Sequence, residues 1–194
     1  PPGITQVTYG KSEHISSFGG NYAKNQYLVL KREFSEHDYT TVLDIGANIG
    51  SFTMSAVGLG LSVHSFEPFP ENIKRLKLSV LVNGADSYVT VHEHGLGYTT
   101  TTALLFTNPT NKVLKSDGYV VSDKNDPIIK DEWKKGAIFT PLNVLRLDDI
   151  KDIPSDIFAV KIDVEGFESL VINGGKHFFK EVRPRIIFIE MLQS

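Results

Sequence analysis

The 194-residue chain contains no cysteine, which excludes disulfides, thiolate metal sites, iron–sulfur clusters and cysteine nucleophiles. It has no apolar run near the roughly 18–20 residues that a membrane-spanning helix needs, and no signal peptide is evident. Neither sign of charge is in large excess, since the formal net charge is −3. General binding of nucleic acid needs a concentrated basic surface, so we expect neither a membrane span nor a nucleic-acid partner.

The remaining composition is that of a globular protein. Hydrophobic residues make up 41% and charged residues 22%, near the averages for soluble domains, and the length fits one domain that can bury its own core. The chain begins Pro-Pro-Gly rather than with methionine, so we expect it to be part of a larger polypeptide. The cytoplasm is the default compartment for such a sequence.

Short apolar runs alternate with helical patterns along most of the chain. Runs typical of buried strands occupy residues 41–46, 62–67, 88–93, 158–163 and 185–190. Helical spacing of apolar residues occupies residues 22–34, 50–57, 70–82 and 167–172, the last continuing to 179 after a break at two glycines. This alternation predicts an α/β fold, a mostly parallel sheet with helices on both faces.

Two parts of the chain depart from this rhythm. Residues 1–40 are interpreted as a polar lead-in and a first helix, and residues 41–194 as a domain with a polar insertion at 98–140. Within the insertion, residues 101–106 and 138–145 are predicted strands that would extend the sheet. The polar stretch 108–135 is too long for an ordinary loop, which indicates a lid or a mobile connection. Substrate choice is expected to reside in the insertion 98–140 as a whole.

Carboxylates occur at the carboxyl ends of the predicted strands, where ligands bind in open parallel sheets. Asp44, Glu67, Asp163 and Glu190 stand at or beside four of the five ends. A strand end needs no acid for its own stability, so this set predicts a binding site.

The turn after the first of these strands reads Asp44-Ile45-Gly46-Ala47-Asn48-Ile49-Gly50. Its glycines permit a tight turn and close packing, and the amides at the helix start can hold a carboxylate or a phosphate. Asn48 stands where the dinucleotide fingerprint G-x-G-x-x-G needs a glycine, so a pyrophosphate is disfavoured. Taken alone, the motif is also compatible with a purely structural turn.

Glu67 follows Asp44 by about 20 residues, at the end of the second predicted strand. An acid at this place can accept hydrogen bonds from both hydroxyls of a ribose and disfavours a 2′-phosphate. Pro68 and Phe69 form a stiff turn whose aromatic ring can lie on an adenine. The alternative interpretation is that Glu67 only caps the next helix.

Two further pairs of polar residues are spaced two apart. Asp163 and Glu165 would share a face if their strand continues that far. The alternative is that these acids only place negative charge at the N-terminus of the following helix, a role that we assign to Glu168. His92 and His94 could bind a metal or act as a base, but the polar face of an exposed strand is the commoner explanation.

Four segments, VLDIGANIGSFT, VHSFEPFPENIKRLK, VKIDVEGFESLVINGG and RPRIIFIEM, occur in this order over about residues 41–97 and 145–191. Together they are similar to the FkbM family of S-adenosylmethionine-dependent O-methyltransferases. The resemblance implies a Rossmann-like class I methyltransferase sandwich. The sheet of that family usually ends with an antiparallel strand pair, and so few residues follow position 190 that we expect this pair to be lacking.

The resemblance also implies the reaction and its participants. S-adenosyl-L-methionine would be the cofactor and S-adenosylhomocysteine the product. The acceptor would be a hydroxylated small molecule or glycan, and we expect methylation of a carbohydrate or another polyhydroxylated compound. A divalent metal that lowers the pKa of the acceptor hydroxyl is left open but not predicted, and its ligands are unknown.

Roles for individual residues follow from this resemblance. The residues expected to bind the cofactor are Asp44, Gly46, Ala47, Asn48, Gly50, Phe52, Glu67, Pro68, Phe69, His94, Gly95 and Asp163. The catalytic candidates, which could remove the proton of the acceptor hydroxyl, are Asp163, Glu165 and Glu190.

Two other functions are compatible with the sequence. An NAD-binding oxidoreductase would share the fold and the ribose-binding acid, although the G-x-G-x-x-G motif and an evident pair of residues for hydride transfer are missing. A catalytically inactive module could keep the cofactor pocket without the activity, since the sheet is expected to be shortened.

Overall fold

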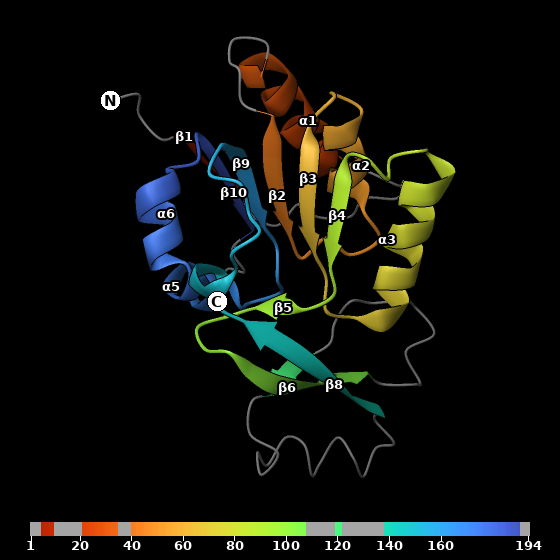
Figure 1. Ribbon diagram of the computed structural model, residues 1–194, viewed down its shortest axis with the longest axis vertical. Helices are drawn as coiled ribbons and strands as arrows, with labels where there is room; N and C mark the ends of the chain where they lie inside the picture. The colour runs from red at the N-terminus through yellow and green to blue at the C-terminus, as the bar shows by residue number, and fades with distance from the viewer. Residues whose placement is uncertain (1–4, 10–20, 35–39, 108–118, 122–137, 191–194) are drawn as a thin grey trace.

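The computed structural model describes residues 5–9, 21–34, 40–107, 119–121 and 138–190 (Figure 1). Its elements in chain order are β1 (Thr5–Tyr9), α1 (Asn21–Phe34), β2 (Thr41–Ile45), α2 (Ser51–Val57), β3 (Ser62–Phe66), α3 (Pro70–Val82), β4 (Val89–His92), β5 (Gly95–Leu96), β6 (Thr101–Thr107), β7 (Tyr119–Val121), β8 (Ile138–Leu145), the 3₁₀ turn η1 (Leu147–Asp149), β9 (Ile157–Ile162), α5 (Glu168–Gly174), α6 (Lys176–Val182) and β10 (Ile186–Glu190).

A six-stranded sheet in the order β1-β10-β9-β2-β3-β4 forms the centre of the fold, and all its strand pairs are parallel. This confirms the predicted α/β architecture. The strands β2 and β9 are buried along their whole length, as expected for parallel strands that are covered on both faces. Of the helices described, none combines the length and the hydropathy that crossing a membrane requires.

Each face of this sheet has its own core. On one face, Leu30 of α1 and Phe52 of α2 pack with Val42 and other strand residues. On the other face, Val171 of α5 packs with Leu43 and further strand residues, and the partly buried side chains of α6 pack against this cluster. Successive residues of β2 thus serve opposite cores, which explains why its sequence is a continuous apolar run interrupted only by Asp44.

A second sheet, in the order β5-β8-β6-β7, lies beyond the carboxyl ends of the central strands (Figure 1). The strands predicted at 101–106 and 138–145 are therefore confirmed, but the expectation that they extend the main sheet is wrong. They pair with each other in antiparallel register from Thr101↔Val144 to Thr107↔Ile138, which satisfies their backbone groups without the edge strand β4. Most of the predicted lid, 108–135, lies outside the described residues; only β7 belongs to them.

The strand β1 was not predicted from the sequence. It pairs in parallel with β10, from Thr5↔Ile186 to Tyr9↔Glu190, and so takes the place beside β10 where the family resemblance suggested a missing antiparallel pair. Five residues within a polar, glycine-containing stretch gave too weak a strand signal to identify. The division of the chain between residues 40 and 41 stays a prediction.

The turn after β2 touches the end of β9 through their backbones. Gly46 has a φ of 82°, and a Cβ atom on it would lie 1.8 Å from the carbonyl oxygen of Asp163. Only glycine avoids both the left-handed strain and this collision. The close approach brings the ends of two neighbouring strands, β2 and β9, into contact.

We predict that Gly46→Ala destabilises the protein much more than Gly60→Ala. Gly60 has the same φ of 82°, but a Cβ atom on it would meet no other atom within 4 Å, so its substitution adds only the left-handed strain of about 1–2 kcal/mol. Gly46→Ala adds overpacking worth about 1–3 kcal/mol more. Urea unfolding measures the free energy of unfolding of both variants. Equal decreases in the two variants would contradict the close approach of Gly46 to Asp163.

Candidate functional site

A cavity of about 340 Å³ lies between the carboxyl ends of β2, β3 and β9 and the second sheet. Eight of the predicted site residues line it: Gly46, Asn48, Glu67, Pro68, Phe69, Gly95, Asp163 and Glu165. The remaining predicted residues, which are absent from its lining, are Asp44, Ala47, Gly50, Phe52, His94 and Glu190. The strand-end motifs, far apart in sequence, are thus brought to one cavity.

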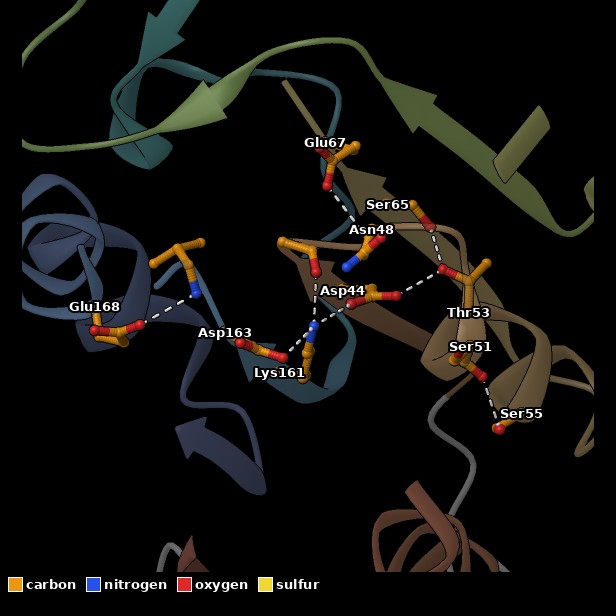
Figure 2. Close-up of polar contacts among 12 residues, drawn as sticks. Asp44, Asn48, Ser51, Thr53, Ser55, Ser65, Glu67, Lys161, Asp163 and Glu168 are labelled. Carbon is orange, nitrogen blue, oxygen red and sulfur yellow. Dashed lines mark hydrogen bonds and ion pairs between the residues drawn. The ribbon is translucent and has the colours of Figure 1, made fainter. Parts of the chain in front are cut away.

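The ammonium group of Lys161 holds the floor of this cavity together (Figure 2). Its Nζ donates to the carbonyl oxygen of Gly46 at 2.7 Å and lies 3.3 Å from carboxylate oxygens of both Asp44 and Asp163. The Lys161 side chain is only 6% exposed. Because a buried charge is tolerated only when it is paired, the three acceptors and the lysine fix one another's positions.

Asp44 is fully buried and acts from behind the cavity wall. Its second oxygen accepts a hydrogen bond from Thr53 Oγ1 at 2.6 Å, and the Thr53 hydroxyl is in turn 2.8 Å from that of Ser65. Asp44 therefore ties β2 to α2 and β3. Lys161, Thr53 and Ser65 were not identified from the sequence; the available signal was a single lysine within the apolar strand 158–162.

Glu67 accepts hydrogen bonds from three protein donors. They are the amides of Asn48 at 2.8 Å and Phe69 at 2.9 Å and the side-chain amide of Asn72 at 3.3 Å. Burial raises the pKa of Glu67, and these hydrogen bonds oppose that rise. A carboxylate has about four acceptor positions, so capacity remains for a ligand hydroxyl while Glu67 also ties the start of α3 to the turn after β2.

The amides of that turn are largely engaged by the protein itself. Those of Gly46 and Ala47 donate to the carbonyl oxygen of Phe66, and that of Gly50 donates to Ala47. With the Asn48 amide on Glu67, four amides that were expected to be open to a ligand anion have protein acceptors. In this structure the turn shapes the cavity instead of presenting those groups to it.

Glu190, the last residue of β10, is hydrogen-bonded through its carboxyl group to Asp163. Burial and the neighbouring charges of Asp163 and Glu165 raise the pKa of Glu190 to about 7, against the opposing effect of Lys161. Two adjacent carboxyl groups disfavour double ionisation. The pair therefore holds a proton that it can exchange near neutral pH.

The histidines form a stacked group beside the cavity rather than a pair on an exposed strand. His92 is mostly buried, lies 3.0 Å from His64 through ring nitrogens and stacks on Phe66 with ring centroids 4.3 Å apart. Burial, with the neighbouring His64, lowers the pKa of His92 to about 4. The described residues contain no group of three or more His, Asp and Glu side chains arranged to hold a metal ion.

Three predicted cofactor residues that do not line the cavity make packing contacts with other side chains. Phe52 lies in the core with its ring centroid 6.0 Å from that of Phe188. A Cβ on Gly50 would be 2.6 Å from the side chain of Leu76, so Gly50 allows α3 to approach. The ring of His94 meets Phe66 edge-on at 5.6 Å.

We predict that Lys161→Met lowers the free energy of unfolding by about 3–5 kcal/mol, because it leaves the buried Asp44 without its ion-pair partner. The matched control is Lys77→Met, since Lys77 pairs with Glu93 on the surface. Such exposed pairs contribute about 0–1 kcal/mol. Urea unfolding at pH 7 measures both, and a Lys161→Met loss as small as that of the control would contradict this role.

Comparison with known proteins identifies the family. The family model described as the methyltransferase FkbM domain matches residues 44–194, whereas a search of curated proteins found no match. Among solved structures, the methyltransferase FkbM from Methylobacillus flagellatus KT is similar with a TM-score of 0.51 and 24% identity, over 77% of this chain and 32% of its own. At that identity the likeness shows the fold alone.

A precorrin-6y C5,15-methyltransferase from Geobacter metallireducens GS-15 is 14% identical over 84% of this chain and 61% of its own, with a TM-score of 0.44. A TM-score this low supports no conclusion about this chain. This chain spans about a third of the length of the Methylobacillus protein. The family model, in contrast, covers most of the chain, and the residues that line the cavity all fall within the matched range. Family membership supports methyltransferase activity: the chain belongs to the FkbM methyltransferase family.

Proposed function

We propose that this chain is the catalytic domain of an S-adenosylmethionine-dependent O-methyltransferase that acts on a hydroxyl of a carbohydrate or another polyhydroxylated acceptor. The observation that carries the proposal is the convergence of the Gly46 turn, Glu67 and Asp163 on one cavity, from the ends of three adjacent strands. Family membership supports the same reaction class.

The chemistry of the cavity wall fits this cofactor, which is cationic at its reactive end and carries no phosphate. Glu67, Asp163 and Glu165 supply carboxylates to the wall, and its described residues include no Lys, Arg or His. Glu67 would hold the ribose, with Pro68 and Phe69 beside the adenine. When bound, S-adenosylmethionine supplies an electrophilic methyl group.

The same wall disfavours the NAD alternative. A pyrophosphate needs free backbone amides at the glycine-rich turn, but the amide of Asn48 donates to Glu67 and those of Gly46 and Ala47 donate to Phe66. The carboxylates would also repel two phosphate charges. We therefore favour methyl transfer over hydride transfer.

The remaining task of the protein is to orient the acceptor and to take up its proton. Reacting atoms must approach to about 3–3.5 Å in line, and a sugar hydroxyl is a weak acid, so a base helps. Asp163 lines the cavity and is hydrogen-bonded to Glu190. We assign proton uptake to this carboxyl pair, with Asp163 facing the acceptor and Glu190 sharing the proton.

Titration calorimetry tests the cofactor assignment. The wild type should bind S-adenosylhomocysteine and not NADH, and Glu67→Ala should weaken that binding by about 1–3 kcal/mol through loss of hydrogen bonds to a charged group. Glu181→Ala, at an exposed acid on α6, is the control. Absence of binding by the folded wild type would refute the proposal, and unchanged affinity of Glu67→Ala would refute the ribose role.

The pH dependence of methyl transfer tests the base. Because the pKa of Glu190 is raised to about 7, its carboxyl group is protonated below that pH and ionised above it. The rate should therefore rise with pH through about 7 and then level off. In the variant Glu190→Gln the rate, measured as release of S-adenosylhomocysteine, should no longer change through this pH range. If the pH profile of the variant keeps the same midpoint, the titrating proton belongs to another group.

A further inference from the structure

Three apolar side chains gather at the rim of the cavity, on the side of α5. Tyr98, Phe167 and Leu170 all line the cavity, yet Tyr98 is 57% exposed and Leu170 is 39% exposed. Single apolar residues on a surface are common, whereas a group of them at the edge of a pocket marks a place where a ligand binds. The three come from two distant segments, the loop between β5 and β6 and the start of α5.

The backbone that carries Tyr98 is held in place from several sides. A Cβ atom on Gly174 of α5 would lie 1.9 Å from the carbonyl oxygen of Gly97 and 3.3 Å from the Cα atom of Tyr98, so α5 packs directly against this segment. The amide of Gly97 donates to the last carbonyl oxygen of β8 at 2.9 Å, and the hydroxyl of Thr100 donates to a carboxylate of η1 at 3.2 Å. Leu170 precedes Gly174 by one helical turn and therefore belongs to the same face of α5.

The loop that leads to Phe167 is fixed as well. The amides of Val164 and Gly166 both donate to Glu168 Oε1 at 3.1 Å, and Glu168 is only 8% exposed. Phe167 lies between this loop and α5, so its backbone has little freedom. A contact surface whose backbone is ordered in advance loses little entropy when a ligand binds.

This group of side chains lies on the side of the cavity that the nucleoside of the cofactor is not expected to occupy. Glu67, which we assign to the ribose, follows β3 beside the start of α3. Phe167 and Leu170 follow β9, on the other side of β2, together with Asp163 and its partner Glu190. Figure 1 shows α3 and α5 on opposite sides of the strand ends. The rim near α5 is thus available to the acceptor.

The rim combines the two kinds of surface that a sugar ring needs. The C–H groups on one face of a pyranose form a flat apolar surface that packs on an aromatic ring, while the hydroxyls surround its edge. Thr99 and Thr101 line the cavity close to Tyr98 in the sequence, and their hydroxyls can both donate and accept. An open-chain polyol offers the same hydroxyls but has no flat apolar face.

We infer that Tyr98, together with Phe167 and Leu170, forms a platform on which the ring of the acceptor packs while one of its hydroxyls faces Asp163. This inference rests on the proposed function and narrows its acceptor class to cyclic polyols, such as pyranoses and cyclitols, in preference to open-chain polyols. The contact is made before and during methyl transfer alike, so it acts mainly on KM.

Cyclic and open-chain polyols test the platform. The kcat/KM for release of S-adenosylhomocysteine is measured with glucose and sorbitol, with galactose and galactitol, and with myo-inositol, which has as many carbons and hydroxyls as sorbitol. The wild type should prefer the cyclic compounds. Tyr98→Ala should lower their kcat/KM roughly tenfold, mainly through KM, because an aromatic contact is lost, and should narrow the ratio of cyclic to open-chain acceptors. Tyr98→Phe retains the ring and should remain near the wild type.

A matched control and a second measurement define the role of Tyr98. Tyr88 is 44% exposed but does not line the cavity, so Tyr88→Ala should leave the kcat/KM of every acceptor unchanged. Titration calorimetry with S-adenosylhomocysteine distinguishes the acceptor from the adenine as the group that contacts the platform. Tyr98→Ala should bind S-adenosylhomocysteine as tightly as the wild type does.

The outcomes separate this inference from the function on which it rests. Unchanged kcat/KM for the cyclic acceptors in Tyr98→Ala, or an equal loss with the open-chain polyols, would overturn the platform. Weaker binding of S-adenosylhomocysteine by this variant would overturn it too, since the ring of Tyr98 would then contact the cofactor. Failure of the wild type to bind S-adenosylhomocysteine, or to methylate any of these polyols, would count against the proposed function and remove the inference with it.

Discussion

The buried ammonium group of Lys161 is the interaction on which the rest of the site depends. It joins Asp44 at the end of β2, Asp163 after β9 and the carbonyl oxygen of Gly46 in the turn between β2 and α2. Burying the charges of Lys161 and Asp44 separately would be costly, so each of them is tolerated only because the other is there. Asp163, which is partly exposed, supplies a second carboxylate to the same ammonium group. The ends of β2 and β9 are thereby held in one arrangement.

Steric contact adds to this electrostatic constraint. Gly46 brings its backbone against the carbonyl group of Asp163, and the second sheet then covers the space that these two strand ends leave open. A cavity forms because the insertion pairs within itself and lies beyond the strand ends, instead of adding strands to the edge of the central sheet. One wall of the site is therefore polar and fixed by the central sheet, and the other is largely apolar.

The distribution of charge at the strand ends underlies the proposed chemistry. Lys161 balances part of the negative charge beneath the cavity, and its partner Asp163 in turn shares a hydrogen bond with Glu190. Burial, together with the neighbouring carboxyl groups of Asp163 and Glu165, brings the pKa of Glu190 to about 7.

The sequence by itself determined the fold class and the strand-end motifs, because hydrophobic period and glycine placement are local properties of the chain. Alternating buried runs and amphipathic helices predicted the parallel sheet, and Asp44, Glu67, Asp163 and Glu190 were identified from their position at the ends of those runs. The location of β1 and the separate second sheet were not predicted, since pairing partners distant in sequence leave no local signal.

Only the tertiary structure decided what each of these groups does. It directed the amides of the Gly46 turn to protein acceptors, buried Asp44 behind the wall, and placed Phe52 in the core. It also assembled Lys161, Thr53 and Glu168 into the supports of the site. Burial, ion pairing and proton sharing depend on distances between residues far apart in the chain, and those distances are fixed by packing rather than by local sequence.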